Sequence, residues 1–202
     1  MKASMAIFQL AGSTVPNHHS IFSSDRWWAS SRSATGPNVS FTDGASSCVL
    51  TLESKAKSLG LSPLGAIRSY AVAGVDIQKE PLLIGLRMHS RWRFNVRDLS
   101  IGIDLFEFHE AFAAQVLATI KALESPEFSR DKLGLSAPLG TIDRSKININ
   151  GGSIPLGHPF GATGVRLILQ TLHALREQKK RYGLISVCAA GGLGAVMIVE
   201  AI

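Results

Sequence analysis

Strands and helices alternate along the second half of the chain, and this order constrains the fold more than any other feature. Strand patterns are predicted at Ile103–Phe108, Tyr182–Val187 and Ala195–Glu200. Apolar residues at helical spacing predict helices over Glu110–Leu123 and Ala162–Gln178. Because each helix must bury its apolar face against another element, the alternation predicts an α/β layered fold. The glycine turn between the last two strands predicts an antiparallel hairpin.

The region before this alternation is less regular. Cys48–Leu52 is predicted as a short buried strand, and Glu53–Leu59 as a short helix that Gly60 stops. Gly65–Val75 is rich in small and β-branched residues and is predicted as a second strand.

Three further segments show neither a helical nor a strand period. Residues 1–40 are rich in Ser and are expected to be irregular. Residues 124–146 are expected to form a loop, and residues 147–161 a glycine-rich loop.

The composition excludes several classes of protein. Hydrophobic residues make up 46% and charged residues 18% of the 202 residues, which is typical of a globular chain. A net charge of +6 permits phosphate-bearing partners, from coenzyme A to nucleic acid, without choosing between them. The two cysteines, Cys48 and Cys188, lie far apart and indicate neither a disulfide framework nor a metal site. No apolar run is long enough to span a membrane.

The strongest candidate for chemistry is His158. It lies in the window from Asn150 to Gly164, which contains five glycines and suits a backbone brought close to a ligand. Pro159 fixes the backbone next to it, and a predicted helix begins just beyond. The positive end of that helix favours the neutral imidazole, which is the form that acts as a base.

Two other positions could contribute. Cys188 ends a predicted strand before Ala-Ala-Gly-Gly, so its sulfur can lie beside free backbone N–H groups that hold a developing oxyanion. A buried strand-end thiol is the alternative. His109 and Glu110 lie where a strand passes into a helix, which is a frequent site position in α/β proteins, although a capping pair is equally compatible with the pattern.

Together these segments resemble the thiolase family. Asn-Gly-Gly-Ser with Gly-His-Pro-Phe-Gly-Ala-Thr-Gly, and then Cys-Ala-Ala-Gly-Gly-Leu-Gly, is similar to the C-terminal thiolase signature. His-Glu-Ala-Phe-Ala-Ala-Gln resembles the variant of the third motif that has His where many members have Asn. This combination resembles most the fatty-acid-oxidation branch, whose members work with a multifunctional β-oxidation subunit. The resemblance covers residues 38–85 and 98–202.

The resemblance implies a fold, a reaction and a set of roles. The fold is a thiolase C-terminal domain over residues 63–202, a mixed sheet covered by helices, with the end of the N-terminal domain at residues 38–62. The reaction is thiolytic cleavage of a 3-ketoacyl-CoA to acetyl-CoA and a shortened acyl-CoA. His158 matches the histidine that activates the nucleophile, Cys188 the cysteine that moves the α-carbon proton, and His109 a residue that helps hold an oxyanion.

The same resemblance assigns the substrate-binding residues and the partners. The backbone N–H of Ala190 is the second oxyanion donor, and Gly157, Gly191 and Glu110 complete the substrate-binding set. Coenzyme A is a substrate, and no metal or other cofactor is expected. The implied partners are a second copy of the chain or a multifunctional β-oxidation subunit, with neither nucleic acid nor stable membrane insertion. The implied compartment is the cytoplasm of a bacterium, or the mitochondrion of a eukaryote.

One essential element of the family has no counterpart in these residues. The nucleophilic cysteine of thiolases precedes Ser-Gly, and no such segment occurs here. Cys48, in Ser-Ser-Cys-Val-Leu, is interpreted as a strand thiol. We therefore expect the isolated chain to be inactive. Two alternatives stay open: an acetyl-CoA acetyltransferase working in the biosynthetic direction, and a non-catalytic remnant that binds coenzyme A or a partner.

Residues 86–97 depart from the family pattern, as do residues 1–37. The family has an apolar helix opening Gly-Pro-Ala-Tyr where this chain has Leu-Arg-Met-His-Ser-Arg-Trp-Arg-Phe. One synonymous codon choice for Gly85–Phe94, with one inserted base, restores that opening, so we hypothesise a single-base deletion. Sequencing the gene tests it, because the hypothesis requires a one-base insertion that restores the helix. A basic and aromatic strip for nucleic acid is the alternative.

Overall fold

A six-stranded mixed sheet with the strand order β2-β1-β3-β6-β5-β4 forms the centre of the molecule. The computed structural model describes residues 5–9, 39, 42–74, 76, 102–133, 140–189 and 192–202. The strands are β1 (Met5–Gln9), β2 (Cys48–Leu52), β3 (Gly65–Gly74), β4 (Leu105–Phe108), β5 (Tyr182–Ala189) and β6 (Leu193–Ala201). β4 and β5 run parallel, whereas the other neighbours pair antiparallel.

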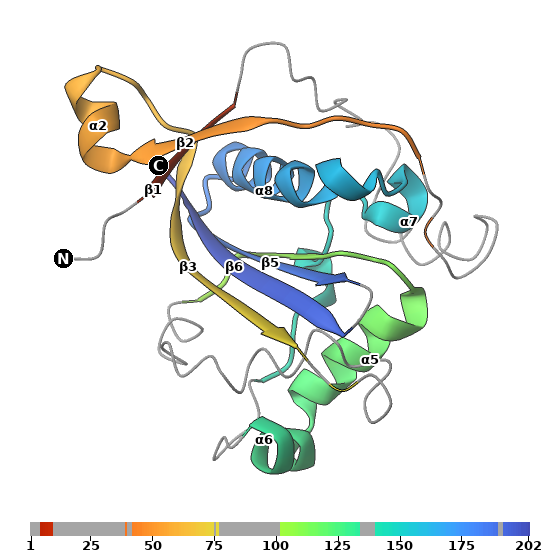
Figure 1. Cartoon of the computed structure of the whole chain (residues 1–202). Helices are drawn as coiled ribbons and strands as arrows, with labels where there is room; N and C mark the ends of the chain where they lie inside the picture. Colours follow the sequence, from red (N-terminus) through yellow and green to blue (C-terminus); the bar gives the residue numbers. More distant parts are fainter. Residues whose placement is uncertain are drawn as a thin grey trace.

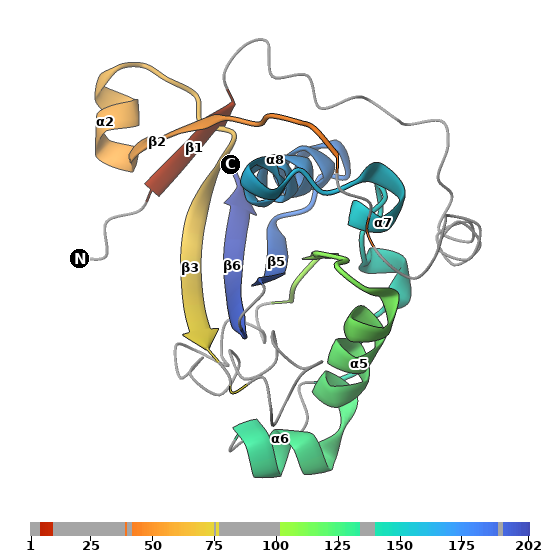
Figure 2. The same cartoon turned by 45° about the vertical axis from the view of Figure 1, so that its right-hand side comes forward.

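Helices cover both faces of this sheet. They are α2 (Glu53–Ser58), α5 (Ala113–Glu124), α6 (Pro126–Leu133), α7 (Ser153–Leu156) and α8 (Phe160–Glu177), with a 3₁₀ turn at Arg144–Lys146. Figures 1 and 2 show α8 on one side of β5 and β6, with α5 and α6 on the other. The layered α/β fold and the mixed sheet predicted from the sequence are confirmed.

The core follows from the periodicity of α8. Leu167, Leu172 and Leu175 recur on one face and are completely buried against Leu105 of β4 and Ile185 of β5. The opposite face of the sheet packs on α5 through a second cluster that contains Phe108, Val116, Ile120 and Leu123. Because strand side chains alternate between faces, neighbouring residues of β4 face different helices.

Several sequence predictions are confirmed with small shifts in their ends. The β5–β6 hairpin is antiparallel, with Cys188 opposite Gly194. The helix after Leu52 ends at Ser58, and Gly60 follows with a φ of 65°, a backbone conformation that favours glycine.

Four predictions need correction. β1 lies within the segment expected to be irregular, and α6 lies within the expected loop over residues 124–146. The glycine-rich loop contains the short helix α7. The strand Cys48–Leu52 exists but is not buried, since Val49, Leu50 and Leu52 are 42%, 48% and 49% exposed. It occupies the sheet edge, where one side of a strand has no neighbour.

Some predictions fall on residues that the structure does not describe. These include the anomalous segment 86–97, most of residues 1–37, and the two predicted site residues Ala190 and Gly191. In the part of the chain that is described, no helix combines the length and apolar character needed to cross a membrane.

Candidate active site

The site begins at the carboxyl end of β4. His109 follows this strand directly, and its backbone N–H donates to the carbonyl oxygen of Ser186 in β5 at 2.8 Å. Because β4 and β5 are parallel, with Phe108 paired to Ser186, Cys188 lies two residues beyond Ser186 at the same end of the sheet. The topology therefore brings two of the predicted residues, His109 and Cys188, to the carboxyl ends of neighbouring strands.

Asn148 ties the following loop to this strand end. Its side-chain amide donates to the carbonyl oxygen of Phe108 at 2.9 Å, and its Oδ1 accepts from the Phe108 N–H at 2.8 Å. The same amide donates to Glu110 Oε1 at 2.6 Å. These bonds continue the sheet pairing with a side chain, so the loop is held at the end of β4.

Glu110 completes the anchoring of the loop. Its second oxygen, Oε2, accepts from the Ile154 N–H at 3.0 Å, and the residue is almost fully buried. Gly152 passes so close that an added Cβ would lie 2.1 Å from the Glu110 carboxyl carbon. Gly152 is therefore needed for close approach rather than for an unusual backbone angle, since its φ is −102°.

His109 itself is held by a hydroxyl and a cation. Its Nδ1 lies 2.9 Å from Ser153 Oγ, at the start of α7. Arg166 of α8 donates from Nη2 to the same oxygen at 2.9 Å, and from Nη1 to Gln170 at 3.3 Å. The sequence did not single out Ser153 or Arg166, although an arginine within the largely apolar middle of the helix was an available signal.

His158 lies against His109. The two ring centroids are 4.2 Å apart at an interplanar angle of 47°, and the Phe160 ring lies 4.7 Å from that of His158 on its other side. His158 Nδ1 is 2.6 Å from Thr163 Oγ1, whose hydroxyl donates to the Pro159 carbonyl at 3.1 Å. The imidazole is thus fixed by the first turn of α8.

Both histidines are held neutral. Burial, His158 and Arg166 lower the pKa of His109 to about 4. Burial and then Arg166 lower the pKa of His158. The direction predicted for His158 agrees, but burial rather than the helix end is the largest cause. A neutral ring has one nitrogen that accepts a hydrogen bond and one N–H that donates.

A buried carboxyl adjoins the same arginine. Glu107, on β4, is almost fully buried, and burial raises its pKa to about 8, although Arg166 lowers it and Glu110 raises it further. Glu107 is therefore protonated at neutral pH. Like Arg166, Glu107 is an ionisable residue that the sequence did not single out.

The segment before β2, which contains Thr42 and Ser46, packs against the glycine-rich segment next to His158. Gly157 has a φ of 92°, and an added Cβ would lie 2.4 Å from Thr42. Ser46 donates to the Ala162 carbonyl at 2.5 Å. Figures 1 and 2 both show this segment running from beside α7, past α8 and into β2. Residues more than a hundred positions apart thus complete one site.

Cys188 is held separately from the histidines. Its thiol donates to Gln115 Oε1 of α5 at 3.6 Å, and burial raises its pKa above that of a free thiol. Cys48 lies in β2, at the opposite edge of the sheet from β4.

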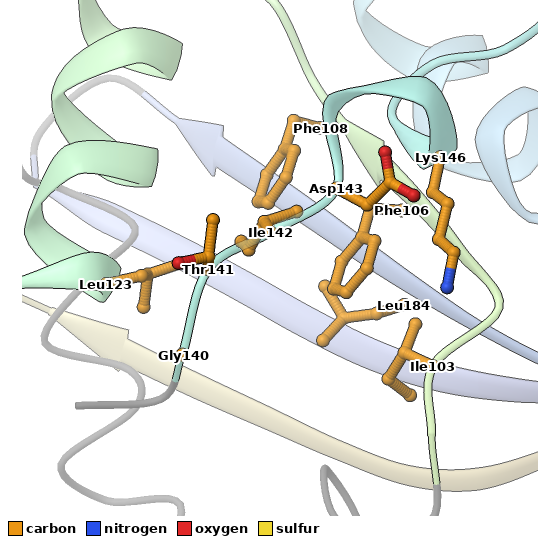
Figure 3. A pocket seen from close by; sticks show the side chains of 10 residues that line it. All are labelled: Ile103, Phe106, Phe108, Leu123, Gly140, Thr141, Ile142, Asp143, Lys146 and Leu184. Atoms are coloured by element: carbon orange, nitrogen blue, oxygen red, sulfur yellow. The ribbon is translucent and has the colours of Figure 1, made fainter. Parts of the chain in front are cut away.

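A cavity of about 210 Å³ lies on the α5 side of the sheet. Figure 3 shows Phe106, Leu184 and Ile103 along it, with Lys146 and Asp143 on the turn beside it. None of the predicted site residues lines this cavity. Among the described residues, no group of three or more His, Cys, Asp or Glu side chains could hold a metal ion.

The fold and the site define an α/β protein with two adjoining neutral imidazoles, one at the end of β4 and one just before α8. Residues 61–201 match the family described as thiolase, C-terminal domain. The chain is 49% identical over 161 residues to the 3-ketoacyl-CoA thiolases of Klebsiella pneumoniae (strain 342) and Escherichia coli O1:K1, covering 79% of this chain and 37% of each relative. This chain belongs to the thiolase family.

Solved structures agree with this assignment. The acetyl-CoA acetyltransferase of Bacillus anthracis is similar with a TM-score of 0.63 and 35% identity, covering 83% of this chain and 38% of that one. Human mitochondrial 3-ketoacyl-CoA thiolase has a TM-score of 0.60 and 30% identity, covering 82% and 38%. The chain therefore spans little more than a third of the length of the relatives it matches.

Proposed function

We propose that this chain carries the proton-transfer half of a thiolase site that acts on 3-ketoacyl-CoA and acetyl-CoA. The observation that carries the proposal is the contact between the neutral rings of His109 and His158, at the end of the sheet where Cys188 lies near the carboxyl end of β5. Curated relatives named 3-ketoacyl-CoA thiolase support the cleavage direction.

Each residue has a defined role in this proposal. His158 accepts the proton of the attacking thiol and helps bind a thioester oxygen. Cys188 moves the proton at the α-carbon of the acetyl group. His109 and the backbone N–H of Ala190 donate hydrogen bonds to the oxyanions.

The remaining substrate-binding residues are Gly157, Gly191 and Glu110. Gly157 and Gly191 are proposed to act through their backbone. Glu110 acts indirectly, because both of its oxygens accept bonds from the loop that carries Ser153 and leads to His158.

Thiolytic turnover requires a nucleophile that these residues do not supply. The two cysteines are Cys188, which has the proton-transfer role, and Cys48, at the far edge of the sheet. An acyl-enzyme therefore cannot form on this chain alone. Full activity needs a nucleophilic cysteine that these residues do not include, which thiolases carry in their N-terminal domain. As in intact family members, the proposed partners are a second copy of the chain or a multifunctional β-oxidation subunit. By analogy with its bacterial relatives, we propose that the chain acts in the cytoplasm.

A binding and turnover experiment tests this proposal. Acetyl-CoA is titrated into the purified chain while the side-chain NMR signals of His109 and His158 are followed, and acetoacetyl-CoA cleavage by coenzyme A is assayed in parallel. We expect saturable shifts of both signals, absent with ATP as a phosphate control, and no cleavage. Cleavage by the purified chain, or shifts that ATP reproduces, would contradict the proposal.

The biosynthetic direction is the second candidate. The Bacillus anthracis relative, an acetyl-CoA acetyltransferase, is more similar in sequence than the human 3-ketoacyl-CoA thiolase, at 35% against 30% identity. Both directions use the same proton transfer at the acetyl α-carbon. A non-catalytic protein that binds coenzyme A would show the shifts but would move no proton.

A further inference from the structure

Both histidines use Nδ1 to contact a hydroxyl group, but the two hydroxyls differ in their other partners. His158 Nδ1 contacts Thr163 Oγ1 at 2.6 Å, and His109 Nδ1 contacts Ser153 Oγ at 2.9 Å. A neutral imidazole carries one hydrogen, on either Nδ1 or Nε2, and the partner of Nδ1 decides which.

Thr163 has already used its only hydrogen. Its hydroxyl donates to the Pro159 carbonyl at 3.1 Å, and a carbonyl oxygen can only accept. Toward His158 the threonine oxygen must therefore accept. Nδ1 of His158 carries the hydrogen, and its Nε2 keeps a free lone pair.

Ser153 is in the reverse situation. It accepts from Arg166 Nη2 at 2.9 Å, and a guanidinium has no lone pair to offer in return. The cation polarises the hydroxyl and makes it a better donor and a poorer acceptor. The Ser153 hydrogen is thus directed to His109 Nδ1, and the ring hydrogen of His109 lies on Nε2.

We propose that Thr163 and the Ser153–Arg166 pair hold His158 and His109 in opposite tautomers. The adjoining rings then present one bare Nε2 and one Nε2–H. Both rings are neutral at pH 7, as this arrangement requires, because burial lowers both pKa values.

The consequence for chemistry rests on the proposed function. His158 has the lone pair that a base needs, and His109 has the N–H that an oxyanion needs. A histidine fixed in this tautomer donates as an asparagine amide does, which accounts for His at a position where many family members have Asn. Ser153, Arg166 and Thr163 are positioning residues in this scheme, since they act through the two rings.

Nitrogen NMR of the full chain, labelled with ¹⁵N-histidine and free of substrate, measures the tautomers directly at pH 7. Loss of a signal in His158→Gln or His109→Gln assigns each ring. We expect protonated Nδ1 and unprotonated Nε2 for His158, and the reverse for His109. The same tautomer in both rings, or a rapid average in either, overturns the proposal.

A matched pair of variants tests the cause. Thr163→Val keeps the shape but removes the hydroxyl, and is expected to move the His158 hydrogen to Nε2 while the His109 signals keep their tautomer. Thr163→Ser retains the hydroxyl and is expected to preserve the wild-type pattern. If Thr163→Val leaves His158 protonated at Nδ1, Thr163 does not set the tautomer. Since no substrate is present, opposite tautomers without acetyl-CoA binding would refute the proposed function and leave this inference standing.

Discussion

His109 and Cys188 lie at the ends of the neighbouring strands β4 and β5, but the protein holds the histidine pair and the thiol in different ways. His109 and His158 are bonded to side chains from the loop before α8 and from α8 itself. Among the described residues, the Cys188 side chain has one long hydrogen bond, to Gln115 on α5 at the other face of the sheet. The imidazoles are fixed in orientation by a buried polar network, whereas the thiol is placed mainly by its strand. Substitutions around the histidine pair should therefore change the free energy of unfolding more than substitutions around Cys188.

The largest expected effect comes from crowding the loop that supports the histidines. Gly152→Ala places a methyl group on the Glu110 carboxyl, within 2.2 Å of both oxygens, so the bonds to Asn148 and Ile154 cannot both survive. We expect a loss of about 3 kcal/mol or more in the free energy of unfolding. Urea denaturation followed by circular dichroism measures it.

Gly164→Ala is the matched control. An added Cβ there meets no atom within 4 Å, and the residue lies inside α8. Alanine is the better helix former, so this variant should gain about 0.5–1 kcal/mol. Equal losses in the two glycine variants would contradict the packing argument.

The next effect concerns the pH dependence of stability and the buried carboxyl of Glu107. The pKa of Glu107 is about 8 in the folded protein and 4.5 as its ordinary value, so its stabilising contribution is complete below pH 4.5 and is lost as the pH rises through 8. His109 acts in the opposite sense, since its pKa falls from 6.5 to about 4 and its contribution is lost as the pH drops through that range.

Above pH 6.5, therefore, the ionisation of Glu107 dominates the change of the unfolding free energy with pH. Between pH 6.5 and 8 the wild-type chain should lose roughly 2 kcal/mol of stability. Glu107→Gln should flatten this slope, because the amide does not titrate. Parallel slopes for the two proteins in urea titrations at several pH values would show that Glu107 is already ionised.

The smallest expected effect lies on the cysteine side. Gln115→Met removes the acceptor of the Cys188 thiol and the bond to Thr119, at nearly constant volume. We expect a loss of about 1 kcal/mol and unchanged His109 and His158 tautomers in the NMR experiment. A change in either tautomer would show that the two sides are coupled.

The parts of this structure that could be predicted from the sequence are those set by local periodicity. The apolar spacing of α8 and the alternation in β5 and β6 gave correct elements because each buries one face. α6 was missed because it is short and polar, although Pro126 at its first position suits a helix start. The exposure of β2 depends on its being an edge strand, which no local pattern records.

The candidate site likewise has parts that the sequence could predict and parts that required the fold. The glycine setting marked His158, and the strand-to-helix transition marked His109, but their contact joins residues 49 positions apart and required the fold. The supporting residues carry weaker signals. Ser153, Thr163 and Glu107 are ordinary residue types. Their importance comes from their burial and from the nearby Arg166. Only the packing of α8 on β4 brings Arg166 into this position.

The central claim is that this chain carries the proton-transfer half of a thiolase site without the nucleophile. Exchange of the acetyl methyl hydrogens of acetyl-CoA in D₂O, followed by ¹H NMR, tests it most directly, since this step needs a base and an oxyanion site but no acyl-enzyme. We expect catalysed exchange that increases with pH, because burial raises the pKa of Cys188, and that falls about 100-fold or more in Cys188→Ala. Exchange no faster than in buffer, or equal in wild type and Cys188→Ala, would contradict the claim.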